Sequence, residues 1–60
     1  MKTVYVYLIA AHVPQVYKDV EKVEVQRYNG FSETLVIFQK NITTHYLLHH
    51  VQNYSVVNDD

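Results

Sequence analysis

Four histidines are the residues of this chain best suited to metal binding or proton transfer, and three of them lie close together: His45, His49 and His50. His45 and His49 are four residues apart, a spacing that on a helix presents two imidazoles to one zinc ion. Zinc enzymes with that motif carry a glutamate between the histidines, and here none is present. On a strand the two histidines would lie about 13 Å apart, too far to share an ion. We therefore expect no metal site and no cofactor.

The serines offer no better chemistry. Ser32 and Ser55 lie in segments of strand composition, and neither has the glycine-flanked turn that exposes a nucleophile. A β-rich chain of 60 residues has little room for a substrate pocket of roughly 300 Å³ or more. We expect that the protein is not an enzyme.

The length and the charge of the chain restrict the functions that remain possible. A chain of 60 residues without cysteine forms one domain whose folding buries only about 60 % of its surface, so a partner subunit is the natural source of extra stability. Five Lys and Arg against six Asp and Glu give a formal charge of −1. The basic residues are scattered, which disfavours nucleic-acid binding because that binding depends on neutralised phosphates.

The start of the chain predicts its location. The apolar stretch from Val4 to Ala11 is short and contains two tyrosines, so it does not have the length of a secretory or membrane segment. We expect a cytoplasmic protein that makes no membrane contact.

Strand-forming valine and tyrosine dominate the composition. The first strand is expected over residues 3–10. Its two faces carry Val4, Val6 and Leu8 on one side, and Tyr5, Tyr7 and Ile9 on the other. Because both faces are apolar or amphipathic, this strand must be central or must cover a second surface.

Asn29-Gly30 predicts a hairpin, because both residues tolerate the positive φ of a two-residue type I′ turn. That loop would place Val25 opposite Thr34 and Val23 opposite Val36. We expect the core face of this hairpin to consist of Val23, Val25, Val36 and Phe38. Leu35 and Ile37 would then lie on the polar side and need a second layer or a partner.

Residues 13–23 are ambiguous. Their valines fall at helical spacing and Pro14 could begin a helix, so a helix over 14–22 is one alternative. Against it, β-branched residues are poor helix formers and no residue suited to an N-cap is in place. We favour a bend at 11–14, followed by a strand that kinks near Asp19 through a β-bulge.

Lys40-Asn41 marks the next turn. A two-residue loop would place His45 opposite Val36, whereas the three-residue loop that we favour places Tyr46 there. The inward face would then consist of Ile42, Thr44, Tyr46 and Leu48. Residues 49–52 resemble a short 3-10 turn before a last strand over 54–57. We expect a single domain over 1–57 and a frayed polar tail over 58–60.

The pattern predicts a mainly β fold, namely a small antiparallel barrel or strongly twisted sheet of four to five strands with a 3-10 turn before the last strand. The alternative is an α+β fold with one helix at 14–22. The chain resembles the SH3-like and Sm-like small barrels, and short β-rich bacterial and phage proteins. The segments that carry the resemblance are Val4-Tyr5-Val6-Tyr7-Leu8, Leu35-Val36-Ile37-Phe38 and Tyr54-Ser55-Val56-Val57. The resemblance implies a binding or scaffold role and identifies no functional residue.

Tyrosine is enriched at protein interfaces because it buries a large area while keeping a polar group. We expect Tyr5, Tyr7, Leu35 and Ile37 to form one apolar surface that closes a homodimer or larger homo-oligomer. The sequence thus predicts a non-enzymatic protein-interaction module that self-associates and that could also bind a protein partner, as a regulatory or accessory protein. The alternative is an Sm-like or cold-shock-like binder of RNA or single-stranded DNA that stacks bases on exposed aromatic rings.

Overall fold

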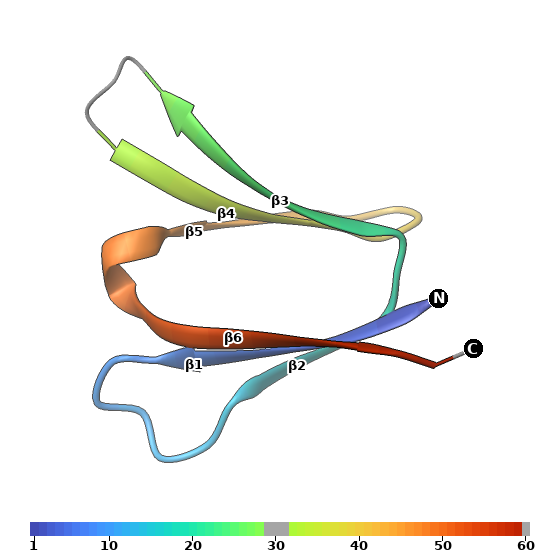
Figure 1. Cartoon of the computed structure of the whole chain (residues 1–60), viewed down its shortest axis with the longest axis horizontal. Helices are drawn as coiled ribbons and strands as arrows, with labels where there is room; N and C mark the ends of the chain where they lie inside the picture. Colours follow the sequence, from blue (N-terminus) through green and yellow to red (C-terminus); the bar gives the residue numbers. More distant parts are fainter. Residues whose placement is uncertain (29–31, 60) are drawn as a thin grey trace.

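The computed structural model describes residues 1–28 and 32–59, which form a mainly β fold of six strands and one 3-10 turn, without an α-helix (Figure 1). The elements are β1 (Lys2–Leu8), β2 (Gln15–Val20), β3 (Lys22–Tyr28), β4 (Ser32–Phe38), β5 (Thr43–Leu47), η1 (Leu48–His50) and β6 (Val51–Asn58). No helix of sufficient length and hydropathy to cross a membrane occurs in this described part.

Two three-stranded antiparallel sheets face each other, with strand orders β2-β1-β6 and β3-β4-β5. Figure 1 shows one sheet above the other, joined at one end by η1 and at the other by the link from β2 to β3. The termini lie together, and the backbone N–H of Asp59 donates to the carbonyl of Met1 at 3.1 Å. The sheets do not close into a barrel, so that form of the predicted fold is wrong, whereas the mainly β class is confirmed.

Most of residues 13–23 are extended, in β2 and the start of β3, and the alternative of a helix over 14–22 is wrong. The expected β-bulge is confirmed: Lys2 pairs with Val20 but Val4 pairs with Tyr17, so β2 carries one extra residue. Asp19 lies in this bulge with a φ of 55°. The chain then changes sheet between β2 and β3. What we expected to be one kinked strand is therefore two, which explains why four to five strands was an undercount.

The register of β3 with β4 differs by one residue from the expected one. Val23 pairs with Ile37 and Val25 pairs with Leu35, and the described ends of the strands pair Tyr28 with Ser32. The Asn29-Gly30 turn itself lies outside the described residues. The prediction failed because Leu35-Val36-Ile37-Phe38 is apolar on both faces, so hydrophobic alternation could not correct an assumed two-residue loop.

The register of β4 with β5 also corrects the loop that we favoured. His45, not Tyr46, pairs with Val36, and Tyr46 pairs with Leu35. The expected inward face of this strand is nevertheless right for Tyr46 and Leu48, which pack against the core, whereas Ile42 is exposed.

The core lies between the sheets and consists of Val4, Val6, Val20, Leu35 and Ile37. Leu35 and Ile37 are 0 % exposed, so the expectation that they lie on an outward face is wrong. Their strand β4 is the middle strand of its sheet, and the other sheet covers its inner side. The prediction that Val4 and Val6 lie on one face of β1 and Tyr5 and Tyr7 on the other is confirmed, and the structure places the valine face in the core.

The C-terminal residues are more ordered than expected. The 3-10 turn ends at His50 and β6 continues to Asn58, so the last strand is longer at both ends than residues 54–57. Asp59 is held at its backbone, whose N–H donates to the carbonyl of Met1, and at its side chain, because Thr3 Oγ1 donates to Asp59 Oδ2 at 2.7 Å. The predicted frayed tail is therefore wrong for residues 58 and 59, and Asp60 lies outside the described residues.

Candidate interaction surface

The outer face of the β2-β1-β6 sheet carries exposed tyrosine and valine side chains. Tyr5 on β1 lies between Val16 on β2 and Ser55 on β6, while Thr3 pairs with Val57. Tyr5 is half-buried, Tyr7 is 37 % exposed, and the two valines are 47 % and 46 % exposed. We call this surface the Tyr face and define it as Tyr5, Tyr7, Val16 and Val57.

The Tyr face is uncharged. In the two rows of paired residues that contain Tyr5 and Tyr7, all within the described residues, no side chain carries a charge. Thr3 lies opposite the bulge of β2, where Lys18 and Asp19 are exposed. Asp59 lies at one end, where its carboxylate accepts the hydrogen bond from Thr3. The middle of the sheet thus presents only apolar, phenolic, hydroxyl and amide groups to solvent.

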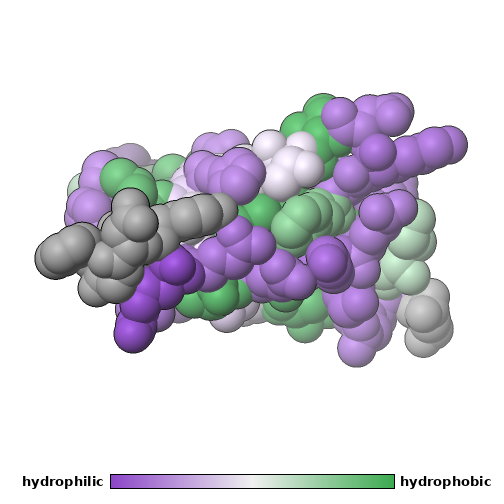
Figure 2. Space-filling view, turned by 90° about the horizontal axis from the view of Figure 1, so that it is seen from above, coloured by the Kyte–Doolittle hydropathy of each residue, from purple (hydrophilic) through white to green (hydrophobic). Residues whose placement is uncertain are grey.

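The outer face of the β3-β4-β5 sheet has the opposite character. Lys22 Nζ lies 3.1 Å from Glu24 Oε2, Gln26 Nε2 donates to Glu24 Oε1 at 2.9 Å, and Lys22 also lies 4.7 Å from the ring centroid of Phe38. The hydrogen bond from Gln26 and then the pairing with Lys22 lower the pKa of Glu24 from its usual value. Val36 is buried beneath these side chains. Figure 2 shows mainly hydrophilic side chains on this face.

The structure therefore separates the four residues that we predicted to share an interface. Tyr5 and Tyr7 lie together on the Tyr face, whereas Leu35 and Ile37 lie in the core on the opposite side of the β2-β1-β6 sheet. Val16 and Val57 were not predicted. Their place follows from the pairing of β2 and of β6 with β1, and we expected Val16 on the buried face of its strand.

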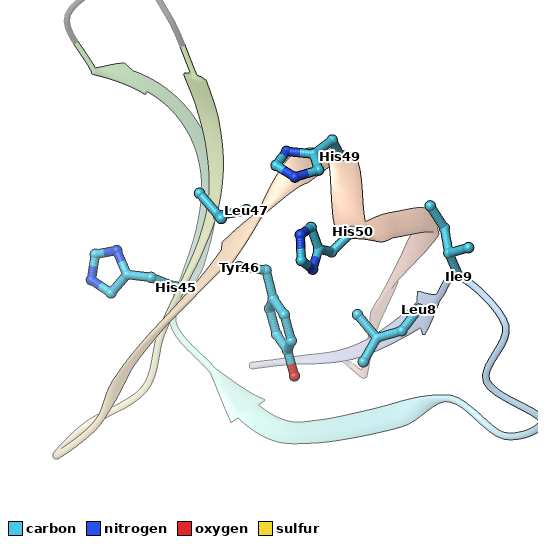
Figure 3. Close-up of a pocket in the computed structure, with 7 residues that line it drawn as sticks. All are labelled: Leu8, Ile9, His45, Tyr46, Leu47, His49 and His50. Atoms are coloured by element: carbon cyan, nitrogen blue, oxygen red, sulfur yellow. The ribbon is translucent and has the colours of Figure 1, made fainter.

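A second feature is a pocket of about 730 Å³ beside η1, so the expectation that the chain has little room for a pocket of this size is wrong. Its lining residues are Leu8, Ile9, His45, Tyr46, Leu47, His49 and His50. Figure 3 shows that His45 lies on the other side of the β5 ribbon from His49 and His50, while the Tyr46 ring points from β5 toward β2. The imidazoles therefore do not converge on one point.

His49 and His50 are the closest pair of imidazoles, with ring centroids 4.3 Å apart and planes at 69°. Within residues 1–28 and 32–59 there is no group of three or more His, Cys, Asp or Glu side chains that could hold a metal ion. No family model, curated protein or solved structure matches the chain. The function is therefore inferred from the surfaces of the molecule itself.

Proposed function

We propose that this chain is a non-enzymatic protein-interaction module that self-associates. The observation that supports it is the contrast between the two sheets: β3-β4-β5 has a charged outer face whose groups pair with one another, whereas β2-β1-β6 exposes uncharged tyrosine and valine. Interface cores are depleted of charge and enriched in tyrosine, so the second sheet has the composition of a contact surface.

The energetics favour a second copy as the partner. Burying one aromatic and one aliphatic side chain per subunit contributes about 3 to 6 kcal/mol before the entropy of association. A small domain has a total stability of only about 5 kcal/mol, so this burial is a large part of it. Two copies also present the same uncharged sheet, and their approach meets no repulsion between like charges.

The resemblance to SH3-like small barrels stays a proposal, because the two sheets do not close into a barrel. The last strand follows a single 3-10 turn and pairs with β1, and the chain passes from one sheet to the other between β2 and β3. A likeness of fold does not by itself assign a function. The proposal therefore depends on the uncharged sheet.

Sedimentation velocity over a range of micromolar concentrations tests the proposal. We expect a dimer or larger assembly at the upper end and a melting temperature that rises with protein concentration, because association stabilises the folded state by mass action. A monomer at every concentration, with a melting temperature independent of concentration, would overturn the proposal.

The salt dependence provides a second test with a different physical basis. Ion pairs at a surface weaken as salt screens them, whereas apolar burial is maintained or strengthened by strongly excluded salts such as sulfate. We expect the assembly to persist at high sulfate concentration. Dissociation as sulfate is added would contradict an uncharged interface.

A further inference from the structure

Strand β6 is an edge strand with unusual properties. It ends its sheet in the order β2-β1-β6, and its eight residues, Val51–Asn58, carry no charge and no proline. All of its residues after Val51 are exposed. A long, exposed, uncharged edge is a template for pairing with another strand, and soluble proteins usually protect such edges.

The other edges of the two sheets carry that protection. On β2, the Gln39 side chain donates to the carbonyl of Lys18 at 2.7 Å, and the bulge at Asp19 interrupts the edge. Strand β3 carries alternating charges, including Lys22 and Arg27. Strand β5 has only five residues. Within the described residues, β6 is the edge that lacks all of these features.

The backbone of β6 shows which groups face the free edge. The N–H of Asp59 donates to Met1 in the ladder with β1, and hydrogen-bonded pairs in an antiparallel ladder alternate with non-bonded ones. The odd-numbered residues 53–57 therefore bond to β1. The N–H and C=O groups of the even-numbered residues 54–58 point away from β1, toward the free edge.

We propose that β6 pairs antiparallel with β6 of a second copy, about a two-fold axis at Ser55. This register is consistent with the bonding pattern and opposes like with like in two of its three pairs. Tyr54 lies opposite Val56 of the second copy, so apolar side chains meet, and Gln52 lies opposite Asn58, so amides meet. Asn53 lies opposite Val57, an unlike pair. The two matched pairs within residues 52–58 favour a second copy over an unrelated strand.

The pairing also covers apolar groups that the monomer leaves open. Tyr54 and Val56 pair with Val6 and Val4, and so lie on the inner face of the sheet, yet they are 39 % and 41 % exposed. In the dimer Tyr54 would pack beside Val56 of the second copy, and Val56 would pack beside the second copy's Tyr54. The two β2-β1-β6 sheets would become one continuous six-stranded sheet that carries both Tyr faces on the same side.

A single cysteine tests this register directly, because the chain contains no cysteine of its own. Ser55 would face Ser55 of the second copy in a non-hydrogen-bonded pair, where Cα atoms are about 4.5 Å apart. That separation lies within the range that a disulfide spans. We expect Ser55→Cys to form a disulfide-linked dimer under mild oxidation, with Val13→Cys and Thr43→Cys as exposed controls that remain uncrosslinked. A Ser55→Cys variant that crosslinks no faster than these controls would overturn the proposed pairing.

A proline at position 56 tests the edge by another route. The N–H of Val56 faces the free edge, so Val56→Pro removes no bond to β1 but prevents pairing with a second strand. We expect Val56→Pro to keep the β signal in circular dichroism and to sediment as a monomer. The matched variant Ile42→Asp places a charge at an exposed position in the β4–β5 link, away from both the edge and the Tyr face, and should remain a dimer.

The pairing rests on the proposed function, because it names the second copy as the partner, but the two can fail separately. A monomeric wild-type protein would overturn both. If the protein remains a dimer in Val56→Pro, the edge pairing is overturned and self-association stands. The same holds if Tyr7→Asp, which places a charge on the Tyr face, dissociates the dimer instead. Ser55→Cys is a conservative exchange at an exposed position, so its result holds even if Val56→Pro does not fold.

Discussion

The hydroxyl groups of Tyr17 and Tyr46 hydrogen-bond to each other across the space between the two sheets. Tyr17 belongs to β2 and Tyr46 to β5, and their rings meet edge to face with centroids 6.2 Å apart. Burial, together with this hydrogen bond, raises the pKa of Tyr17 to about 12. Both tyrosines pack against the core, so the pair is a directional polar contact between two layers held together mainly by apolar side chains.

Removing one hydroxyl of this pair should destabilise the protein. Tyr17→Phe leaves the hydroxyl of Tyr46 without its partner in a partly buried place, which costs about 1 to 3 kcal/mol. We expect Tyr46→Phe to have a similar effect and the double variant to cost less than the sum of the two. Urea unfolding of the four proteins measures these free energies. Tyr7→Phe is the control, because Tyr7 is exposed, and strictly additive losses would contradict the coupling.

The raised pKa of Tyr17 predicts a loss of stability in alkaline solution. Below pH 10 the phenol is protonated in both the folded and unfolded states, and its contribution to stability is fully present. As the pH rises from 10 to about 12, the unfolded chain loses this proton first, so the free energy of unfolding falls. Urea midpoints across this range should fall more steeply for the wild-type protein than for Tyr17→Phe. Parallel curves would show that Tyr17 titrates normally.

The burial of Ile37 predicts a large cost of truncation. Ile37→Ala removes buried methyl groups from the core between the sheets and should cost about 2 to 5 kcal/mol, enough to unfold a marginal domain near room temperature. Val13→Ala is the control, since Val13 is exposed, and it should change the midpoint little. A small effect of Ile37→Ala in thermal melts would place this side chain outside the core.

The sequence alone was sufficient to predict the β class, the two faces of β1 and the bulge near Asp19. The faces of β1 have a local cause, because Val4 and Val6 alternate with tyrosines. The bulge was predicted from a change of buried parity after Val20, whereas the structure places that change before Val20, because Tyr17 and Val20 both face the core and Val16 is exposed. The registers of β4 could not be predicted, because Leu35-Val36-Ile37-Phe38 is apolar at every position. An error of one residue there exchanges its two faces, and this placed Leu35 and Ile37 on the surface.

The candidate surface was accordingly half predicted. Tyr5 and Tyr7 could be assigned to one outward face from alternation within a single strand. Val16 and Val57 join them only through pairings between distant parts of the chain, which depend on how the sheets are ordered. The exposed edge of β6 likewise depends on its position at the end of a sheet, which residue types do not specify.

The backbone at Asp19 gives a sharp test of the bulge. Its φ of 55° lies in the left-handed region, which aspartate tolerates and β-branched residues do not. Asp19→Val should cost about 1 to 2 kcal/mol, whereas Asp19→Gly should be neutral or slightly stabilising. The comparison of the two variants by urea unfolding isolates the backbone, because both remove the carboxylate. Equal losses in both variants would point to the carboxylate and not to the backbone conformation.

Binding to RNA or single-stranded DNA is the rival function, and the structure supplies a reason to expect little of it. Two of the basic side chains are paired with carboxylates: Lys22 Nζ lies 3.1 Å from Glu24 Oε2, and Arg27 Nη2 lies 3.5 Å from Glu33 Oε2. The exposed tyrosines lie on an uncharged face, so bases stacked there would have no cation beside their phosphates.

We therefore expect no saturable binding when a fluorescent single-stranded oligonucleotide is titrated with the protein at low salt. The variant Ser55→Lys is the informative comparison, because it adds a cation at the register of Tyr5 on β1 and so supplies what the face lacks. Weak, salt-sensitive binding by this variant alone would show that charge was the missing element. Micromolar binding by the wild-type protein that weakens steeply as salt rises would contradict this expectation, because such a slope measures phosphates neutralised on binding.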